Sequence, residues 1–432
     1  MKNKKINIVT LGCSKNTVDS EKLLRQISRG GYLVKHDADD TSSGTVIINT
    51  CGFINDAKEE SIDTILKFVR AKQAGKIRNL YVMGCLSERY SDALRSEIPE
   101  VDNYFGVNDI TAILTGLGIT PDRDSANERE LTGPGHYAYL KVSEGCDRTC
   151  AFCAIPLIRG KCISRPIEEL DDEAGKLAAD GVKELILIAQ DLSYYGLDLY
   201  KRQVLPELTR KLVASGNFEW LRLHYLYPAN FPLEMLDIIA ENESICKYID
   251  IPVQHITDNM LLKMRRSHDR KSTEKLLRQI RERLPEAAIR TTLIVGHPGE
   301  TEEDYEQLKR FVTDFRFDRL GVFPYSHEEG THAGINYTDD VPEELKQERV
   351  AELMEIQQGI SEKLNQEKVD TVHKVLIDRK EGSWFVGRTQ FDSPEVDQEV
   401  LISDTYALTT GAFYNIRIDR AEEFDLYGYP VK

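Results

Sequence analysis

Short runs of β-branched and apolar residues alternate with amphipathic helical stretches along most of this chain, and this alternation restricts its fold more than any other feature. The alternation is typical of parallel α/β structure, because a chain leaving one parallel strand must cross back, usually through a helix, to start the next. At 432 residues the chain is too long for one ordinary core. The pattern changes at two places and predicts three domains, over residues 1–122, 132–365 and 366–432.

The first segment predicts a parallel-sheet α/β domain. Its expected strands cover residues 6–11, 45–49 and 79–83, and its expected helices cover 17–29, 56–73 and 87–98. Pro, Gly, Asn and Asp are frequent in residues 120–135, which we interpret as a linker.

The second segment repeats the alternation on a larger scale. Six strands are expected, at residues 137–142, 184–189, 220–225, 248–253, 289–295 and 319–323. The helices expected in this segment cover residues 168–180, 232–241, 272–284, 302–315 and 342–366. Six strand–helix units favour a barrel, or an open barrel short of eight units, with its functional site at the carboxyl ends of the strands.

After residue 368 the chain changes to short alternating strands separated by turns. These strands are expected at residues 371–377, 384–390, 398–402 and 414–418. The pattern predicts a small antiparallel β-module, either a closed or a nearly closed barrel.

The sharpest local motif is Cys146-x3-Cys150-x2-Cys153, just after the first strand of the second segment; these cysteines are called the loop set. Thiolates at this spacing can wrap around one iron–sulfur cube, each binding one iron. Three protein ligands leave the fourth iron open to a substrate or cofactor, so we expect a catalytic site. Zinc is the weaker alternative, because it usually takes four ligands from paired motifs.

Cys13, Cys51 and Cys85, the N-terminal set, are far apart in sequence, yet each directly follows an expected strand of the first domain. Because parallel strands point the same way, residues just past their carboxyl ends gather on one edge of the sheet. Three separately buried cysteines are the alternative. Equivalent placement of all three favours a second iron–sulfur cluster.

The two remaining cysteines fit neither set. Cys246 precedes a strand in an apolar context and is expected in the core, whereas the polar stretch around Cys162 is compatible with exposure. Eight cysteines in 432 residues do not indicate a disulfide scaffold. No apolar run approaches the roughly 18 residues of a membrane span, so we expect a reducing, cytoplasmic compartment.

Polar groups suited to an amphiphilic cofactor follow the later strands of the second segment. They are Gln190, Asp191, His224, Tyr225, Gln254, His255, residues 296–300 and residues 325–327. Each histidine by itself indicates a hydrogen-bonding group more often than a ligand. The basic stretch 263–283 is interpreted as a solvated helix face.

The loop set resembles the three-cysteine motif of the radical S-adenosylmethionine enzymes, which holds a 4Fe-4S cluster. Together with the N-terminal set and the terminal β-module, it makes the chain resemble the methylthiotransferases throughout, with an N-terminal cluster domain, a radical barrel and a TRAM module. Residues 251–255, 321–326 and 387–392 resemble the RimO branch, which modifies an aspartate of small ribosomal subunit protein twelve. The related MiaB branch modifies tRNA.

The resemblance implies two 4Fe-4S clusters, one on each cysteine set, and S-adenosylmethionine as both radical source and methyl donor. It places S-adenosylmethionine near Gln190, Gln254 and Gly296, and no catalytic residue is expected beyond the cluster ligands. A 5′-deoxyadenosyl radical would take a hydrogen from the aspartate β-carbon, where a methylthio group is then attached. The implied partners are the ribosomal protein, free or in the subunit, and an electron donor such as flavodoxin or ferredoxin, with no membrane.

Charge bears on the choice between protein and tRNA as substrate. Residues 1–131, 132–365 and 366–432 carry net charges of -1, -10 and -5, so no expected domain is basic. A tRNA-binding module is expected to show a positive footprint, whereas an acidic one suits a lysine- and arginine-rich ribosomal protein. Two alternatives stay open: a tRNA methylthiotransferase, and a non-catalytic iron–sulfur scaffold that binds ribosomal protein.

Overall fold

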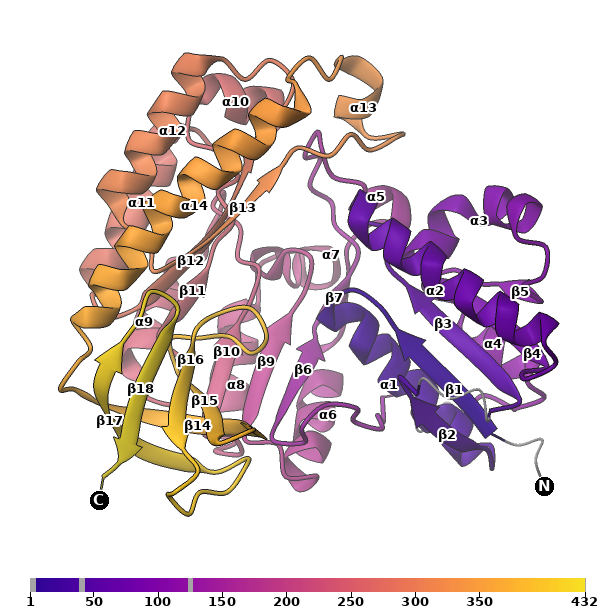
Figure 1. Cartoon of the computed structure of the whole chain (residues 1–432). Coiled ribbons are helices and arrows are strands. Elements are labelled where there is room, and N and C mark those ends of the chain that lie inside the picture. The colour runs from indigo at the N-terminus through magenta and orange to yellow at the C-terminus, as the bar shows by residue number, and fades with distance from the viewer. Residues whose placement is uncertain (1–4, 39–42, 123–126, 432) are drawn as a thin grey trace. The chain divides into compact units, whose positions relative to one another are not determined.

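The computed structural model describes residues 5–38, 43–122 and 127–431 (Figure 1). Residues 123–126 of the expected linker lie outside this range. The chain forms two compact units. Unit 1 consists of Met1–Gly133, Tyr139–Arg148 and Cys153–Lys176, and unit 2 consists of Pro134–Ala138, Thr149–Phe152 and Leu177–Lys432. The limits of the three domains expected from the sequence stay a prediction.

Unit 1 is built on a five-stranded parallel sheet in the order β2-β1-β3-β4-β5. The strands are β1 (Lys5–Thr10), β2 (Leu33–His36), β3 (Thr45–Thr50), β4 (Asn79–Gly84) and β5 (Asn103–Tyr104). All three expected strands are present. The sequence pattern missed β2, a four-residue strand at the edge of the sheet, and β5, which has only two residues, because neither is long enough to show a period.

Helices cover both faces of this sheet. One core packs α2 (Asn55–Gln73) and α3 (Cys85–Glu97) against β3 and β4, and the other packs α1 (Ser14–Arg29) and α4 (Ile110–Gly116) against β1, β3 and β4. The central strand β3 is buried along its whole length, as expected for a parallel strand covered on both faces.

The remainder of unit 1 follows the strand β6 (Tyr137–Lys141), which the boundary between the units crosses. It contains an antiparallel pair, β7 (Ser143–Glu144) and β8 (Ile163–Ser164), with α5 (Ile155–Ile158) between them. Helix α6 (Ile167–Ala179) follows and leads into unit 2.

Five further strands belong wholly to the first part of unit 2: β9 (Glu184–Ile188), β10 (Trp220–Leu223), β11 (Tyr248–Asp250), β12 (Ala288–Val295) and β13 (Arg319–Pro324). Together with β6, these strands form two three-stranded sheets, in the orders β10-β9-β6 and β11-β12-β13. Main-chain hydrogen bonds join β10 to the β11 side, from Cys246 N to Leu221 O and from Leu226 N to Asp250 O, both at 2.9 Å. Six strands in chain order confirm the expected barrel-type arrangement.

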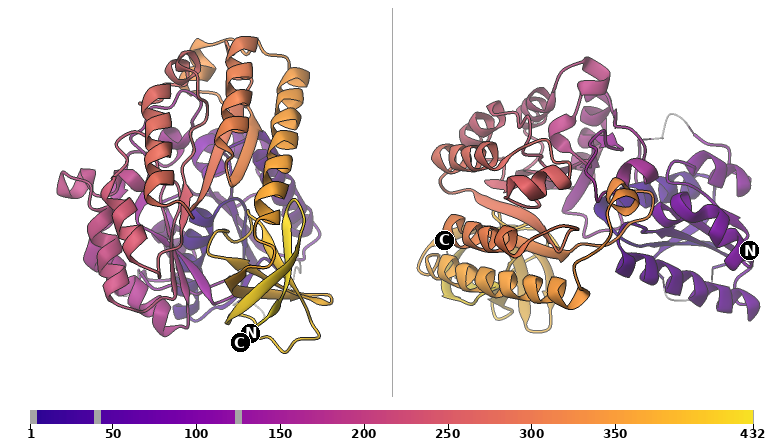
Figure 2. Two further views of the ribbon diagram at one scale, coloured as in Figure 1. Left: turned by 90° about the vertical axis from the view of Figure 1, so that its left-hand side faces the viewer. Right: turned by 90° about the horizontal axis from the view of Figure 1, so that it is seen from above.

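The helices of unit 2 lie between and after these strands (Figure 2). They are η1 (Leu192–Tyr194), α7 (Leu197–Tyr200), α8 (Leu205–Ala214), α9 (Glu234–Glu241), α10 (Asp258–Lys263), α11 (Arg270–Arg283), α12 (Glu302–Phe315), α13 (His332–Asn336) and α14 (Glu343–Gln366). Capping boxes at Asp269 and Thr301 start α11 and α12 immediately after their loops. No helix among the described residues is long and apolar enough to cross a membrane.

The chain ends in a closed five-stranded barrel of order β14-β15-β16-β18-β17. Its strands are β14 (Val372–Glu381), β15 (Trp384–Thr389), β16 (Glu399–Ser403), β17 (Phe413–Ala421) and β18 (Asp425–Pro430). The four expected strands are present. The sequence pattern missed β18, where Gly428 and Pro430 interrupt the apolar run, although this strand closes the barrel by pairing with both β16 and β17.

This terminal barrel packs against the starts of the strands β10, β11 and β12. The shared apolar cluster contains Trp220, Cys246, Tyr248 and Ala288 on one side and Leu376, Phe391 and Phe413 on the other. The stretch 387–392 supplies much of the polar contact. The main-chain oxygen of Gln390 accepts from Arg222 at 2.9 Å, and its side chain accepts from the Lys247 main chain at 3.1 Å.

A chain of buried charges completes this contact. Arg222 Nε donates to Glu184 Oε1 at 2.7 Å, and the other oxygen of Glu184 contacts Arg388 from β15. Arg388 continues to Asp378 at 2.8 Å, and Asp378 to His136 at 2.8 Å. Burial would raise the pKa of Glu184, but Arg388 and Arg222 outweigh it and hold that pKa below its usual value.

Replacing Glu184 by Gln should lower the free energy of unfolding by about 3–5 kcal/mol, because it leaves Arg222 and Arg388 buried without their shared carboxylate. Urea titration measures this loss. Glu219→Gln is the matched control, since Glu219 pairs with Lys374 across the same contact but is exposed, so its loss should stay below about 1 kcal/mol. Equal losses in the two variants would contradict the importance of the buried charge chain.

Candidate active site

The three cysteines of the N-terminal set follow three neighbouring strands. Cys13 comes after β1, Cys51 directly after β3 and Cys85 directly after β4. Thr50 and Gly84 are partners in the β3–β4 register, so Cys51 and Cys85 leave the sheet side by side. Adjacent strands lie about 4.8 Å apart. The sheet therefore gathers this set at one edge, as the sequence predicts.

Two glycines show how closely the three loops approach one another. A Cβ at Gly12 would lie 2.8 Å from Cys51 Cβ and 3.0 Å from its Sγ, and the φ of Gly12 is +92°. A Cβ at Gly52 would lie 2.7 Å from the main chain of Leu86, next to Cys85. Because a side chain at either position would push the loops apart, both glycines allow the cysteines to come together.

The thiols of this edge differ in exposure. Cys13 is exposed, whereas Cys51 and Cys85 are buried. Burial raises the pKa of Cys51, and it raises the pKa of Cys85 to about 11 although Arg159 acts in the opposite direction. A cluster bound here must therefore displace protons from buried thiols, so its binding should be favoured at higher pH.

Arg159, directly after α5, lies beside this edge and is 5% exposed. Its Nη2 donates to Asn16 Oδ1 at 2.6 Å and lies 3.6 Å from Cys85 Sγ. Its Nη1 donates to Glu144 at 2.7 Å and to Asp19 at 3.2 Å. The sequence pattern did not single out Arg159, because nothing local distinguishes it from other arginines of the polar stretch after α5.

The loop set lies between β7 and α5, where the boundary between the units passes through the motif. Cys146 and Cys153 belong to unit 1 and Cys150 belongs to unit 2. Within unit 1, Cys146 N donates to Gly160 O at 3.0 Å. Within unit 2, Arg266 Nη1 lies 3.5 Å from Cys150 Sγ, and the Tyr227 hydroxyl lies 3.9 Å from it.

Arg266 corrects one interpretation from the sequence. It belongs to the basic stretch 263–283, interpreted as a solvated face, yet it donates to Pro252 O at 2.6 Å and stacks on the Tyr227 ring at 4.1 Å. Arginine side chains thus lie beside Cys85 in the N-terminal set and beside Cys150 in the loop set, an arrangement that suits thiolates. No three Cys, His, Asp or Glu side chains within the described ranges are arranged to hold a single metal ion.

The residues predicted to contact S-adenosylmethionine all lie at carboxyl ends of strands in unit 2. Gln190 follows β9, Gln254 follows β11 and Gly296 follows β12. The main chain of Gln254 bonds to Thr292 and Ile294, while its buried Oε1 has no hydrogen-bond partner in the structure. A buried acceptor without a donor fits an amino or hydroxyl group of a bound ligand.

Backbone conformation marks the same strand ends. Tyr225, after β10, and Gln254 have φ values of +62° and +70°, a region that non-glycine residues enter rarely and at a cost. Such residues are frequent at ligand sites. His224, which the sequence placed among the cofactor-facing groups, instead contacts Ser393 of the terminal barrel at 3.0 Å. Its side chain serves the packing of that barrel.

A buried polar cluster at the ends of β11 and β12 extends this site. His255 Nε2 lies 3.7 Å from Glu300 Oε1, and Arg349 Nη1 of α14 lies 3.6 Å from the same oxygen. Glu300 also accepts from Gly296 N. The carboxylate of Glu300 therefore closes the turn 296–300 from within. The sequence pattern did not single out Arg349, because it belongs to a helix that is distant in the chain.

The two cysteines outside both sets have structural surroundings. Cys246 is 1% exposed within the apolar contact with the terminal barrel, which confirms its expected core role. Cys162 is 6% exposed, so the polar stretch around it does not expose this residue. The pairing of β7 with β8 folds this polar stretch back, and Cys162 N donates to Asp147 at 3.1 Å.

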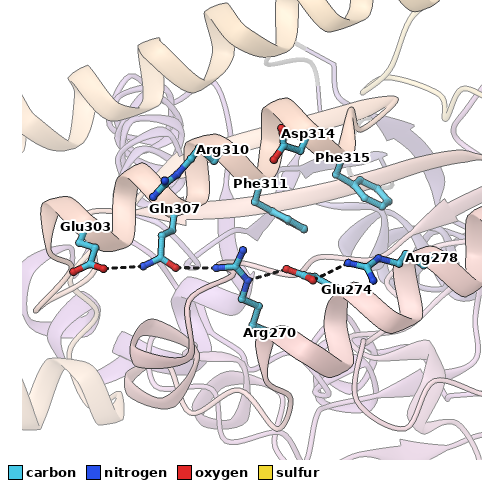
Figure 3. A pocket seen from close by; sticks show the side chains of 9 residues that line it. All are labelled: Arg270, Glu274, Arg278, Glu303, Gln307, Arg310, Phe311, Asp314 and Phe315. Atoms are coloured by element: carbon cyan, nitrogen blue, oxygen red, sulfur yellow. Dashed lines mark hydrogen bonds and ion pairs between the residues drawn. The ribbon is translucent and has the colours of Figure 1, made fainter.

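A groove of about 610 Å³ lies between α11 and α12 (Figure 3), and its lining includes none of the strand-end residues described above. All its lining residues are helical. Arg270 bonds to Glu274 and Gln307, both at 2.8 Å, and Arg278 bonds to Glu274 at 3.1 Å. These charges satisfy one another along the junction of two helices, so the groove contributes nothing to the candidate site.

His297 should make stability depend on pH. Burial lowers the pKa of His297 to about 4, with His255 and Lys263 adding to the effect and Asp339 opposing it. The unfolded chain, with a histidine pKa of about 6.5, then binds the proton first, so folding loses about 3 kcal/mol as the pH falls from about 6.5 to 4. Urea titrations across this range should show that loss in the wild type and a smaller one in His297→Asn. Equal slopes would contradict the assignment.

Comparison with known proteins places three families along the chain. Residues 5–106 match the uncharacterized protein family UPF0004, residues 140–312 the radical SAM superfamily and residues 369–431 the TRAM domain. Among solved structures, the radical S-adenosylmethionine methyltransferase TsrM from Kitasatospora setae aligns with a TM-score of 0.55 at 16% identity, covering 77% of this chain and 74% of its own. The radical enzyme OxsB aligns with a TM-score of 0.52 at 11% identity, over 82% and 56%. These two likenesses concern the fold.

Relatives of high identity extend over the whole chain. A protein of Phocaeicola vulgatus is 55% identical and covers 99% of both chains, and one of Flavobacterium johnsoniae is 54% identical over 100% of this chain and 99% of its own. Both are named ribosomal protein uS12 methylthiotransferase RimO. The chain therefore belongs to the radical S-adenosylmethionine methylthiotransferase family, in its RimO branch.

Proposed function

We propose that this enzyme attaches a methylthio group to the β-carbon of an aspartate in ribosomal protein uS12. The observation that carries the proposal is the sequence identity of 54–55%, over nearly the whole chain, to relatives whose names state that substrate. The family uses S-adenosylmethionine and a 4Fe-4S cluster. We assign one such cluster to the loop set and a second to the N-terminal set.

The surroundings of both cysteine sets support two clusters. The N-terminal set leaves the sheet over three adjacent strands, and glycines admit the close approach of its loops. The loop set has the spacing that places three thiolates on one cube with one iron left open. When bound, a cluster on the loop set would supply the electron for reductive cleavage of S-adenosylmethionine, and the cluster held by the N-terminal set would supply the sulfur.

The chain's own residues would hold and orient the cofactor. Gln254 offers a buried acceptor. Gly296 has a φ of +72° and no side chain, which lets the turn after β12 pack directly against the Lys346 side chain of α14. Arg266 and Tyr227, which stack on each other, both contact Cys150 Sγ. Buried side chains at the strand ends, among them Tyr325, limit the access of water to a reactive intermediate.

Charge supports a protein substrate over tRNA. The terminal barrel, which in a tRNA enzyme would be expected to be basic, carries a net charge of -5 over residues 366–432. A ribosomal protein rich in lysine and arginine complements this surface. An electron donor such as flavodoxin or ferredoxin would reduce the clusters.

Anaerobically reconstituted protein should hold about eight irons, as two 4Fe-4S clusters. Replacing all three cysteines of either set by Ala should leave about four. Cys150→Ala should abolish formation of 5′-deoxyadenosine from S-adenosylmethionine, because it removes one ligand of the radical cluster. Cys246→Ala is the control and should retain eight irons, since Cys246 lies in an apolar cluster. About four irons in the wild type would refute the two-cluster assignment.

Mass spectrometry of ribosomal proteins from strains with and without the gene tests the substrate. One aspartate of uS12 should carry a methylthio group only when the gene is present. Complementation with Cys150→Ala should not restore the modification, whereas complementation with Cys246→Ala should. Loss of methylthio-adenosine from tRNA with uS12 unchanged would instead establish the tRNA enzyme.

A further inference from the structure

Asn16 and Arg159 form a buried pair next to the N-terminal set. Neither residue is among the proposed cluster ligands. Asn16, in the first turn of α1, is fully buried, and Arg159 is 5% exposed. The two meet through the 2.6 Å hydrogen bond from Arg159 Nη2 to Asn16 Oδ1. All the residues involved belong to unit 1.

Asn16 connects the ends of all three cysteine-bearing strands. Its Nδ2 donates to Leu11 O at 2.8 Å, two residues before Cys13, and to Thr50 O at 3.2 Å, one residue before Cys51. Its Oδ1 lies 3.8 Å from Cys85 Sγ. One amide therefore sets the spacing of the three loops, and Arg159 fixes the orientation of that amide.

The carboxylates that compensate the charge of Arg159 contact its guanidinium group at Nη1. Asp19 and Glu144 accept from its Nη1, and Lys141 contacts the same two carboxylates. Two cations therefore face two anions, which makes the burial of all four groups tolerable. Nη2 points the other way, toward Asn16 and the Cys85 sulfur at 3.6 Å. Hydrogen bonds and positive charge at a cluster sulfur favour the reduced, more negative state.

Arg159 also comes from the segment that follows the loop set. It lies six residues after Cys153, and Ala154 and Ile158 of the same segment pack against Cys85 and Val107. The loop that begins with one cysteine set thus ends in contact with a cysteine of the other. The fold makes the environment of the N-terminal site depend on that loop.

We propose that Arg159 is a positioning residue of the N-terminal site, which fixes Cys85 through Asn16 and places a cationic N–H against its sulfur to stabilise the reduced state of a cluster held there. The proposal rests on the proposed function, because it needs a cluster on Cys13, Cys51 and Cys85. It assigns a role to a residue outside both cysteine sets.

The test uses the full chain with the loop set replaced by Ala, so that only the N-terminal cluster is present. Redox titration followed by electron paramagnetic resonance gives the midpoint potential of that cluster. Arg159→Gln should shift the potential to more negative values, and Arg159→Lys, which keeps the charge, should shift it less. Arg165→Gln is the matched control and should leave the potential unchanged, because Arg165 is also an arginine of unit 1 but pairs with Glu173 at 2.7 Å.

The outcomes separate this proposal from the proposed function. If the parent chain with Arg159 intact binds no cluster, the two-cluster function fails. If the parent binds one and Arg159→Gln has the same midpoint potential, the role of Arg159 is refuted, as it is if Arg165→Gln shifts the potential equally. Loss of iron from Arg159→Gln at an unchanged melting temperature supports the positioning role. If Arg159→Gln does not fold, the midpoint potential of Arg159→Lys decides. A shift to more negative values supports the role of Arg159, and any other result refutes it.

Discussion

The common direction of parallel strands is the constraint on which the rest of this structure depends. In unit 1 it carries three cysteines, distant in the chain, to the same edge of one sheet. In unit 2 it brings Gln190, Gln254 and Gly296 to the carboxyl ends of β9, β11 and β12. Chemistry is concentrated at carboxyl ends because the loops there are free to vary while the strands hold them in place.

The opposite ends of the unit 2 strands have a structural task. The terminal barrel covers the starts of β10, β11 and β12 with an apolar cluster and the charge chain through Glu184 and Arg388. The stretch 387–392, one of those that resemble the RimO branch, makes this contact. Within it, Arg388 contacts Glu184 and the main-chain oxygen of Gln390 accepts from Arg222, so both residues join the terminal barrel to the strands.

Much of the fold could be predicted because strands and helices of ordinary length carry their own periodicity. β9 and β12 and the helices α2 and α12 begin and end within a residue or so of their expected limits. The missed elements were short, such as β5, or were interrupted by glycine and proline, such as β18. Long-range pairing stabilises such strands, and a local pattern does not contain it.

The sequence by itself determined the fold class, both cysteine sets and the strand ends that form the candidate site, because spacing and periodicity are local properties of a chain. Only the tertiary structure decided which side chains surround the sulfurs. Arg159 reaches Cys85 from 74 residues away, and Arg266 reaches Cys150 from 116 residues away. Both are buried or stacked at points where separate segments meet, and such meeting points depend on packing, which no single segment encodes.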